Sequence, residues 1–203
     1  NISQFEDFSV KVTSFSIITC ERSASFEKAV RSYVKHNNSR KHNVIYYVFY
    51  DSQKSSSLER NREIISAVEA DLNVVIQHVD GAAKKQFLRS LQEKTSAAGV
   101  PPEVIEFALS CKDNSISSVS GQNRNYYLLF TAGEKAVSVD DDTLYEPRGF
   151  LQENDGVNIT SRSVPNRIDY FFDIQTLEED VPSMHFDLLG EYAKTLGVRL
   201  REY

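Results

Sequence analysis

The sequence predicts an α/β protein with an open, doubly wound and mostly parallel sheet that carries helices on both faces. Segments rich in β-branched and aromatic residues alternate with amphipathic segments through the first 80 residues. Such alternation indicates parallel strands joined by right-handed crossover helices. The segment NVIYYVFYDS is a continuous apolar run, as expected of a strand whose two faces are both covered.

The first part of the chain has the order β-α-β-α-β. Each predicted strand is rich in Val, Ile, Phe or Tyr, and each predicted helix repeats its apolar residues at i, i+3 and i+4. The predicted strands are Lys11–Cys20, Asn43–Ser52 and Leu72–Asp80, and the predicted helices are Ser23–Asn37 and Ser56–Ala70.

The second part of the chain is predicted to return to the sheet through helices. Residues 81–110 are predicted to be helical, with Pro101 and Pro102 restarting the chain after Gly99, and Cys111–Ser118 is a polar linker. The remaining predictions are a helix at Gly121–Glu134 that ends at Gly133, a strand at Lys135–Asp142, a strand at Ile168–Ile174 and a helix at Met184–Gly197.

Composition narrows the function. The chain has 203 residues, is 40% hydrophobic and has a net charge of −6, so we expect a sizeable core and no nucleic-acid partner. The negative net charge favours a divalent cation over nucleic acid as a ligand. Cys20 and Cys111 lack the spacing of metal ligands, and we expect a reducing, cytoplasmic location. No apolar run is long enough to predict a transmembrane segment. Neither a G-x-G-x-x-G fingerprint nor a Walker loop is present.

Asp140, Asp141 and Asp142 follow the last apolar strand of this unit directly. In open α/β sheets, ligands bind beyond the carboxyl ends of strands. Alternate side chains of an extended backbone share a face, so we expect Asp140 and Asp142 to point to one site and Asp141 to point away. Clustered carboxylates suit Mn²⁺ or Mg²⁺, which bridge to phosphates. The alternative is a solvated acidic turn.

Two segments resemble a known family. Ser14–Tyr33 is similar to the opening strand, donor-binding turn and first helix of GT-A type glycosyltransferases, which have a Rossmann-like fold. Gly121–Thr143 resembles the segment in which an Asn-Arg helix precedes the D-x-D strand. The D-x-D motif also follows the first strand by about 120 residues, as in that family. The resemblance extends from Val12 to Pro147.

The resemblance implies a metal-dependent, hexosyltransferase-like enzyme that transfers a sugar from a UDP- or GDP-linked donor to an unknown acceptor. Asp140 and Asp142 would bind Mn²⁺ or Mg²⁺, Asp140 also approaching the ribose, and Asp141 would support them. The residues that would face the donor are Thr19, Cys20, Glu21, Asp51, Asn123 and Arg124. Three of these residues have a structural alternative: Glu21 as an exposed loop charge, Asp51 as a turn residue and Arg124 in a structural salt bridge.

The resemblance also implies a division of the chain. Residues 1–150 would form the nucleotide-sugar-binding core, and residues 151–203 a partial acceptor side or C-terminal extension. We therefore expect an N-terminal or truncated catalytic domain. His185 would be a late metal ligand or a packing residue. The candidate catalytic bases, among which the sequence does not choose, are Glu153, Asp155, Asp173 and Asp187, together with Asp169, Glu178 and Glu179.

Three rival functions stay open at this point. A phosphohydrolase of the haloacid dehalogenase class has a similar pair of aspartates, but after the first strand of its fold. A nucleotidyltransferase requires a Gly-rich loop after the first strand, and CERSASFE contains no Gly. A non-catalytic module that binds a sugar nucleotide or a partner chain fits the short C-terminal part.

Overall fold

A single parallel sheet organises the part of the chain that the structure describes. The computed structural model describes residues 11–50, 54–110, 120–147, 175, 176, 179, 181, 183 and 185–195. Its four strands are all parallel and have the order β3-β2-β1-β4. They are β1 (Ser14–Thr19), β2 (Ile45–Tyr50), β3 (Ile76–Val79) and β4 (Ala136–Asp140). The prediction of an α/β fold with a parallel sheet is confirmed.

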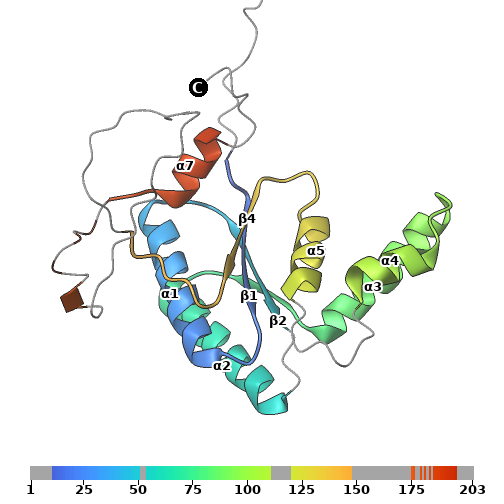
Figure 1. The fold of residues 1–203 in the computed structure, drawn as a ribbon. Coiled ribbons are helices and arrows are strands. Elements are labelled where there is room, and N and C mark those ends of the chain that lie inside the picture. The colour runs from blue at the N-terminus through green and yellow to red at the C-terminus, as the bar shows by residue number, and fades with distance from the viewer. Residues whose placement is uncertain are drawn as a thin grey trace, which may run out of the picture.

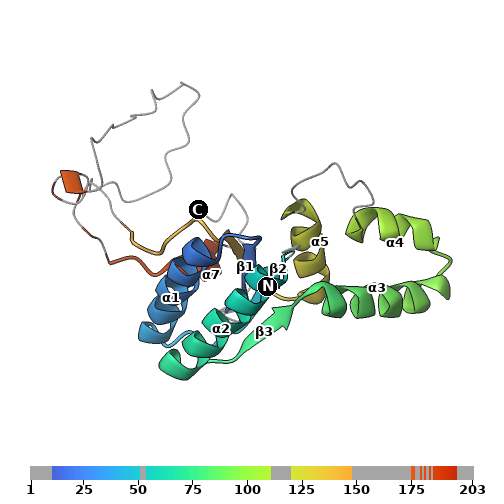
Figure 2. The same cartoon turned by 90° about the horizontal axis from the view of Figure 1, so that it is seen from below.

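Helices cover both faces of this sheet (Figures 1 and 2). On one face, α1 and α2 pack side by side, and on the other face α5 lies against β1 and β2 with α3 and α4 beyond it. The helices are α1 (Ser23–Ser39), α2 (Ser55–Leu72), α3 (Gly81–Ser96), α4 (Pro102–Leu109), α5 (Ser120–Phe130) and α7 (Leu188–Thr195).

The alternation of side chains along each strand produces two hydrophobic cores. Phe15 and Ile17 of β1 join the core under α1 and α2, which Phe26 and Val30 of α1 complete. Ile18 points to the opposite face, where it belongs to the core under α3, α4 and α5. Strands buried on both faces need apolar residues at nearly every position, which explains the continuous apolar runs in the sequence.

Capping and turn residues mark where helices begin and end. The Asp80 carboxylate accepts hydrogen bonds from the backbone N–H groups of Ala82 and Ala83, both at 3.0 Å, and so caps α3. Gly99 and Gly133 have φ angles of +75° and +89°, which favour glycine. The first separates α3 from α4, and the second leads the chain from α5 into β4.

Strand order places the first and last strands of the described sheet side by side. β1 pairs with β2 on one side and with β4 on the other. The chain moves outward from β1 to β3, and then returns through α3, α4 and α5 to the other edge of β1. This reversal is a topological switch point, where ligands bind in open α/β sheets. The switch point lies between the carboxyl ends of β1 and β4.

Tyr127 fixes α5 to the amino-terminal ends of β1 and β4. Its hydroxyl donates a hydrogen bond to the carbonyl of Val137 at 2.9 Å and lies 3.3 Å from the Ser14 hydroxyl. Burial raises the pKa of Tyr127 to about 12. Because α5 also carries Asn123 and Arg124, this contact positions two of the predicted site residues.

The two-sided core predicts that alanine substitutions at two phenylalanines differ greatly in their effect on the free energy of unfolding. Phe49 is fully buried, whereas Phe107 is 89% exposed. We expect Phe49→Ala to lower the free energy of unfolding by about 3–5 kcal/mol, because it leaves a cavity. The matched substitution Phe107→Ala changes it by less than about 0.5 kcal/mol. Urea denaturation measures both, and similar losses in the two variants would contradict this packing.

Tyr127 also predicts a loss of stability at alkaline pH. Between about pH 10 and the folded pKa of about 12, the phenol ionises in the unfolded chain but keeps its proton in the folded one. The unfolded state then binds fewer protons, so stability falls as pH rises through this interval, by roughly 2–3 kcal/mol. Denaturation of the protein and of Tyr127→Phe at several pH values measures it. The variant should fall less steeply, and equal slopes would refute the assignment.

Candidate functional site

The candidate site lies at the carboxyl ends of β1 and β4. In the parallel register, Ile18 of β1 pairs with Asp140 of β4. The end of β1 and the residues after it, Thr19–Arg22, therefore lie next to Asp141 and Asp142, which follow β4. Parallel strands end at a common edge, so this proximity follows from the strand order itself.

Asp141 is the buried centre of the site, with no exposed side-chain surface. One carboxylate oxygen, Oδ2, accepts a hydrogen bond from the Thr19 hydroxyl at 2.6 Å. The other, Oδ1, lies 2.5 Å from Nη2 of Arg22, but it accepts no hydrogen bond of good geometry from the described residues. A buried carboxylate needs a compensating charge and hydrogen bonds, and Arg22 and Thr19 supply them.

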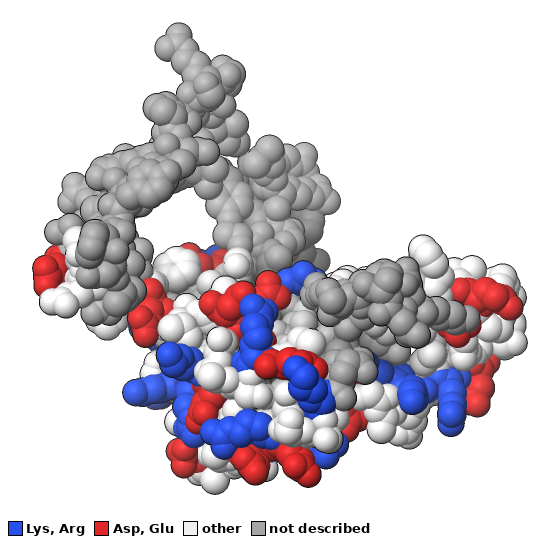
Figure 3. Space-filling model, turned by 60° about the horizontal axis from the view of Figure 1, so that its bottom comes forward, with Lys and Arg blue, Asp and Glu red and all other residues white. Residues whose placement is uncertain are grey.

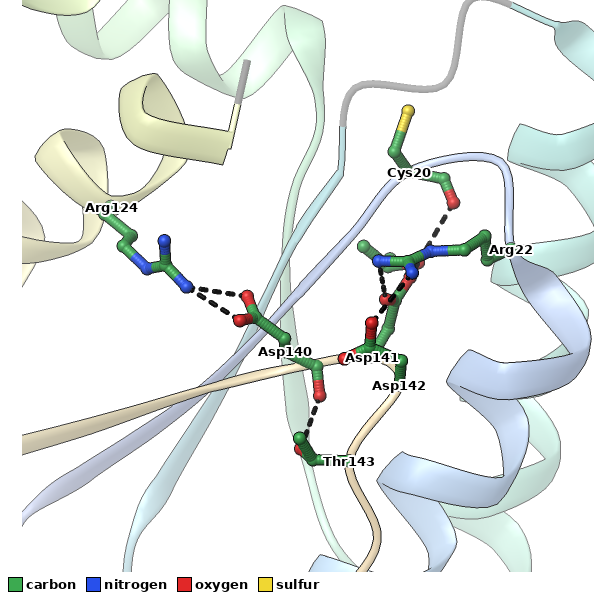
Figure 4. A network of polar contacts seen from close by, with 8 residues as sticks. Cys20, Arg22, Arg124, Asp140, Asp141, Asp142 and Thr143 are labelled. Carbon is green, nitrogen blue, oxygen red and sulfur yellow. Dashed lines mark hydrogen bonds and ion pairs between the residues drawn. The ribbon is translucent and has the colours of Figure 1, made fainter. Parts of the chain in front are cut away.

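Two arginines reach the acidic turn from different elements (Figure 4). Arg22, just before α1, also donates from Nη1 to Asp142 at 2.9 Å. Arg124 of α5 donates from Nη2 to both carboxylate oxygens of Asp140, at 2.7 and 2.8 Å. The hydrogen bond to Asp142 and the charge of Asp141 raise the pKa of Arg22. Each aspartate of the triplet thus contacts an arginine.

Asp141 points away from the exposed Asp140 and Asp142, as predicted, but not through the alternation of an extended strand. β4 ends at Asp140, and the chain turns at Asp141 and Asp142, where the Thr143 N–H approaches the Asp140 carbonyl. A turn does not keep the two-residue period of a strand. Asp141 consequently faces the interior and shares Arg22 with Asp142, while Asp140 faces Arg124 on the other side.

The outer residues of the site are exposed. The side chains of Asp140 and Asp142 are 44% and 54% exposed, and those of Arg124 and Arg22 are 48% and 56% exposed. Lys54 pairs with Glu21 at 2.6 Å nearby. Figure 3, which turns the carboxyl ends of the strands forward, shows positive and negative side chains interspersed on this face. Neither sign dominates it.

A buried lysine lies beside the end of β2. Lys84 of α3 is 4% exposed, and its ammonium donates to the carbonyl of Tyr50 at 3.2 Å and to Asn123 Oδ1 at 2.5 Å. Asn123, predicted to face the donor, is itself buried and holds Lys84. Its neighbour Arg124 reaches the acidic turn instead.

Comparisons of the chain with protein-family models, with curated proteins and with solved structures find no match in any of the three. The function must therefore be argued from the site. Across the described ranges, the structure has no helix that is both long and apolar enough to span a bilayer.

The acidic turn has the donor atoms for a metal ion but does not form a complete cage. Within the described residues, no group of three His, Cys, Asp or Glu side chains is arranged to hold a metal. Asp140 and Asp142 are exposed carboxylates on either side of the buried Asp141. Mg²⁺ is commonly held by one or two carboxylates together with substrate phosphates and water. The residues therefore fit an ion that arrives with a phosphate ligand.

Two predicted residues lie far from this site. Asp187 binds His42 Nε2 at 2.6 Å, and His185 lies 3.5 Å from Arg40. His42 and Arg40 come after α1, whereas Arg22 comes before it. α1 has 17 residues, so its ends are about 25 Å apart. His185 as a ligand in the Asp140–Asp142 site and Asp187 as its base are therefore both wrong for this arrangement.

Several predicted residues lie outside the described part of the chain. They are Asp51, Cys111, Glu153, Asp155, Asp169, Asp173 and Glu178. Cys20 is described and half-buried, and its backbone carbonyl accepts a hydrogen bond from the N–H of Arg22. Glu179 is exposed and accepts a hydrogen bond from Gln175 at 3.2 Å.

Sequence reasoning missed Arg22 and Lys84 as site residues. Arg22 carried a usable signal, because it follows the first strand at the edge where the acidic turn must also lie. Lys84 carried none, because a lysine in the first turn of a polar helix is ordinarily exposed.

The Thr19–Asp141 hydrogen bond should be worth a measurable part of the stability. Thr19→Val removes the hydroxyl and leaves a buried carboxylate oxygen without its donor, so we expect a loss of about 1–3 kcal/mol in the free energy of unfolding. Thr13→Val removes an exposed hydroxyl that donates to Glu134 at 3.0 Å and should cost less than about 0.5 kcal/mol. Urea denaturation compares the two variants. Equal losses would show that the buried hydrogen bond contributes no more to stability than the exposed one.

Proposed function

We propose that this chain binds a nucleoside-diphosphate sugar together with Mn²⁺ or Mg²⁺ at the carboxyl ends of β1 and β4, as the donor-binding core of a GT-A type glycosyltransferase. The observation that carries the proposal is the acidic turn flanked by two arginines at the switch point of a parallel sheet. The motifs that resemble that family, around Thr19–Arg22 and Arg124–Asp142, are the residues that meet there.

The charges of the site suit a ligand that carries both signs. Carboxylates are suited to a hard cation, and guanidinium groups are suited to phosphate oxygens. In the free protein, these groups neutralise one another through the pairs Arg22–Asp142 and Arg124–Asp140. Exposed ion pairs contribute only about 0–1 kcal/mol each, so exchanging them for a metal–diphosphate complex costs little.

The buried and exposed groups then have different roles. Asp141 stays bonded to Thr19 and keeps the turn in place. Asp140 and Asp142 would hold the cation, while Arg124 and Nη1 of Arg22 would bind the phosphates and Nη2 of Arg22 would stay with Asp141. When bound, the cation stabilises the charge that develops on the departing diphosphate. The two arginines add donors at the same oxygens, so the protein both orients the leaving group and shares its charge.

The acceptor hydroxyl needs a base if the reaction inverts the anomeric centre. Asp187 is too far away for this role. The other candidates, Glu153, Asp155 and Asp173, lie outside the described residues and stay predictions.

A melting experiment tests the proposal. UDP or GDP with Mn²⁺ should raise the melting temperature by more than the sum of the two separate shifts, because the ion bridges the diphosphate and the turn. A ligand at about 100 times its dissociation constant stabilises by roughly 3 kcal/mol. Asp142→Asn should lose most of the extra shift while keeping the fold, because Asp142 is exposed.

Glu59→Gln is the matched control. Glu59 is an exposed acid of α2, and its neutralisation should leave the extra shift intact. The proposal fails if neither nucleotide shows a shift beyond the sum in the unchanged protein, or if Asp142→Asn and Glu59→Gln behave alike. Slow, Mn²⁺-dependent hydrolysis of a UDP- or GDP-sugar would separate a transferase from a module that only binds the nucleotide.

A further inference from the structure

A cavity of about 740 Å³ lies along the outer side of α1. It is bounded by the second half of α1, by the segment that follows the acidic turn and by residues just before α7. Its volume is in the range of sites that hold small molecules, about 300–1,000 Å³. Tyr145 of the cavity lining is three residues after Asp142, and Lys35 is 13 residues beyond Arg22, so the cavity starts near the acidic turn and extends along α1 away from it. None of its lining residues belongs to the proposed donor site.

The charged side chains of this cavity are mainly positive. Arg31, Lys35 and Arg40 line it, against one carboxylate, that of Glu146. Arg31 is already paired with Asp71 at 2.8 Å and Glu27 at 3.4 Å. Lys35 and Arg40 form no ion pair with a carboxylate of the described residues. In a chain of net charge −6, Lys35 and Arg40 form a local excess of positive charge.

The cavity also has an aromatic wall. The rings of His36 and Tyr145 stack with centroids 3.6 Å apart and planes at 25°. Nε2 of His36 is buried and has no hydrogen-bond partner among the described residues. Burial and the charge of Arg40 lower the pKa of His36, which leaves the ring neutral at neutral pH. Tyr145 is held by its hydroxyl, which donates to the carbonyl of Phe186.

We propose that this cavity binds a small phosphorylated molecule with a flat ring. Its phosphate would lie between Lys35 and Arg40, and its ring would lie against the wall formed by His36 and Tyr145. Both cations are exposed and both line the cavity, Lys35 from α1 and Arg40 from the residue just after its end, so one anion can reach both without rearranging the core. The proposal does not rest on the proposed function, because the two sites share none of these residues.

Phenylphosphonate is a suitable probe, because it joins a ring to a phosphate-like dianion that phosphatases do not cleave. Isothermal titration calorimetry should show saturable binding that is tighter than that of inorganic phosphate or benzyl alcohol. The double substitution Lys35→Gln with Arg40→Gln should weaken it about 10- to 100-fold, as expected for charge-assisted hydrogen bonds. Lys28→Gln, an exposed lysine of the same helix outside the cavity, should change it by less than about twofold.

The histidines locate the bound probe. The chain has four, and NMR of a sample labelled with ¹⁵N-histidine resolves their rings. The resonances of His36 and His185, which line the cavity, should move on titration, whereas those of His78 in β3 should not. Arg124→Gln should leave the affinity unchanged.

Three results would overturn the proposal. They are no saturable binding, a loss of binding in Arg124→Gln but not in the double variant, and equal movement of all histidine resonances. The melting temperature of the double variant shows that it is folded, and Arg40→Lys should restore part of the affinity lost in Arg40→Gln. A probe that binds at the acidic turn instead would move none of the cavity histidines.

Discussion

The hydrogen bond from Thr19 to Asp141 joins the carboxyl ends of β1 and β4, and the other charged groups of the site are arranged around it. It holds a carboxylate in the interior, where a negative charge requires a partner. Arg22 meets that requirement and thereby comes within reach of Asp142 as well. One buried carboxylate thus positions Arg22 and, through it, the exposed Asp142. Without these contacts, the three adjacent carboxylates of the acidic turn would repel one another.

The site is close to neutral because its ion pairs compensate one another, and this affects which ligands it favours. A free cation must displace arginines that then lose their partners, and a free phosphate must displace carboxylates in the same way. A metal–phosphate complex replaces both partners together. The arrangement therefore discriminates against either component alone, although the exposed pairs are weak.

The fold was more predictable from the sequence than the site. Apolar runs such as Ile45–Tyr50 identify buried strands, and the helices between them require parallel pairing, so the sheet follows from local patterns. Strand order also placed Thr19 near the acidic turn. The contacts of Asp141 with Thr19 and Arg22 could not be predicted, because they depend on β4 ending at Asp140 rather than two residues later. The remote position of Asp187 depends on its contact with His42 beyond the far end of α1, which no local pattern specifies.

The chain segment after the acidic turn links the two proposed sites physically. Thr143 accepts a hydrogen bond from the Tyr33 hydroxyl at 3.1 Å, and the N–H of Tyr145 donates to the Ser32 hydroxyl at 3.0 Å. These bonds tie the segment to α1 immediately after Asp142. Asp142 can therefore contact a ligand by rotating its side chain alone. A larger shift of its backbone must break the hydrogen bonds of Thr143 and Tyr145, and the second of these also shapes the cavity. If a ligand in the cavity strengthens those contacts and thereby changes the affinity of the acidic turn, a ligand at the acidic turn must change the affinity of the cavity by the same factor.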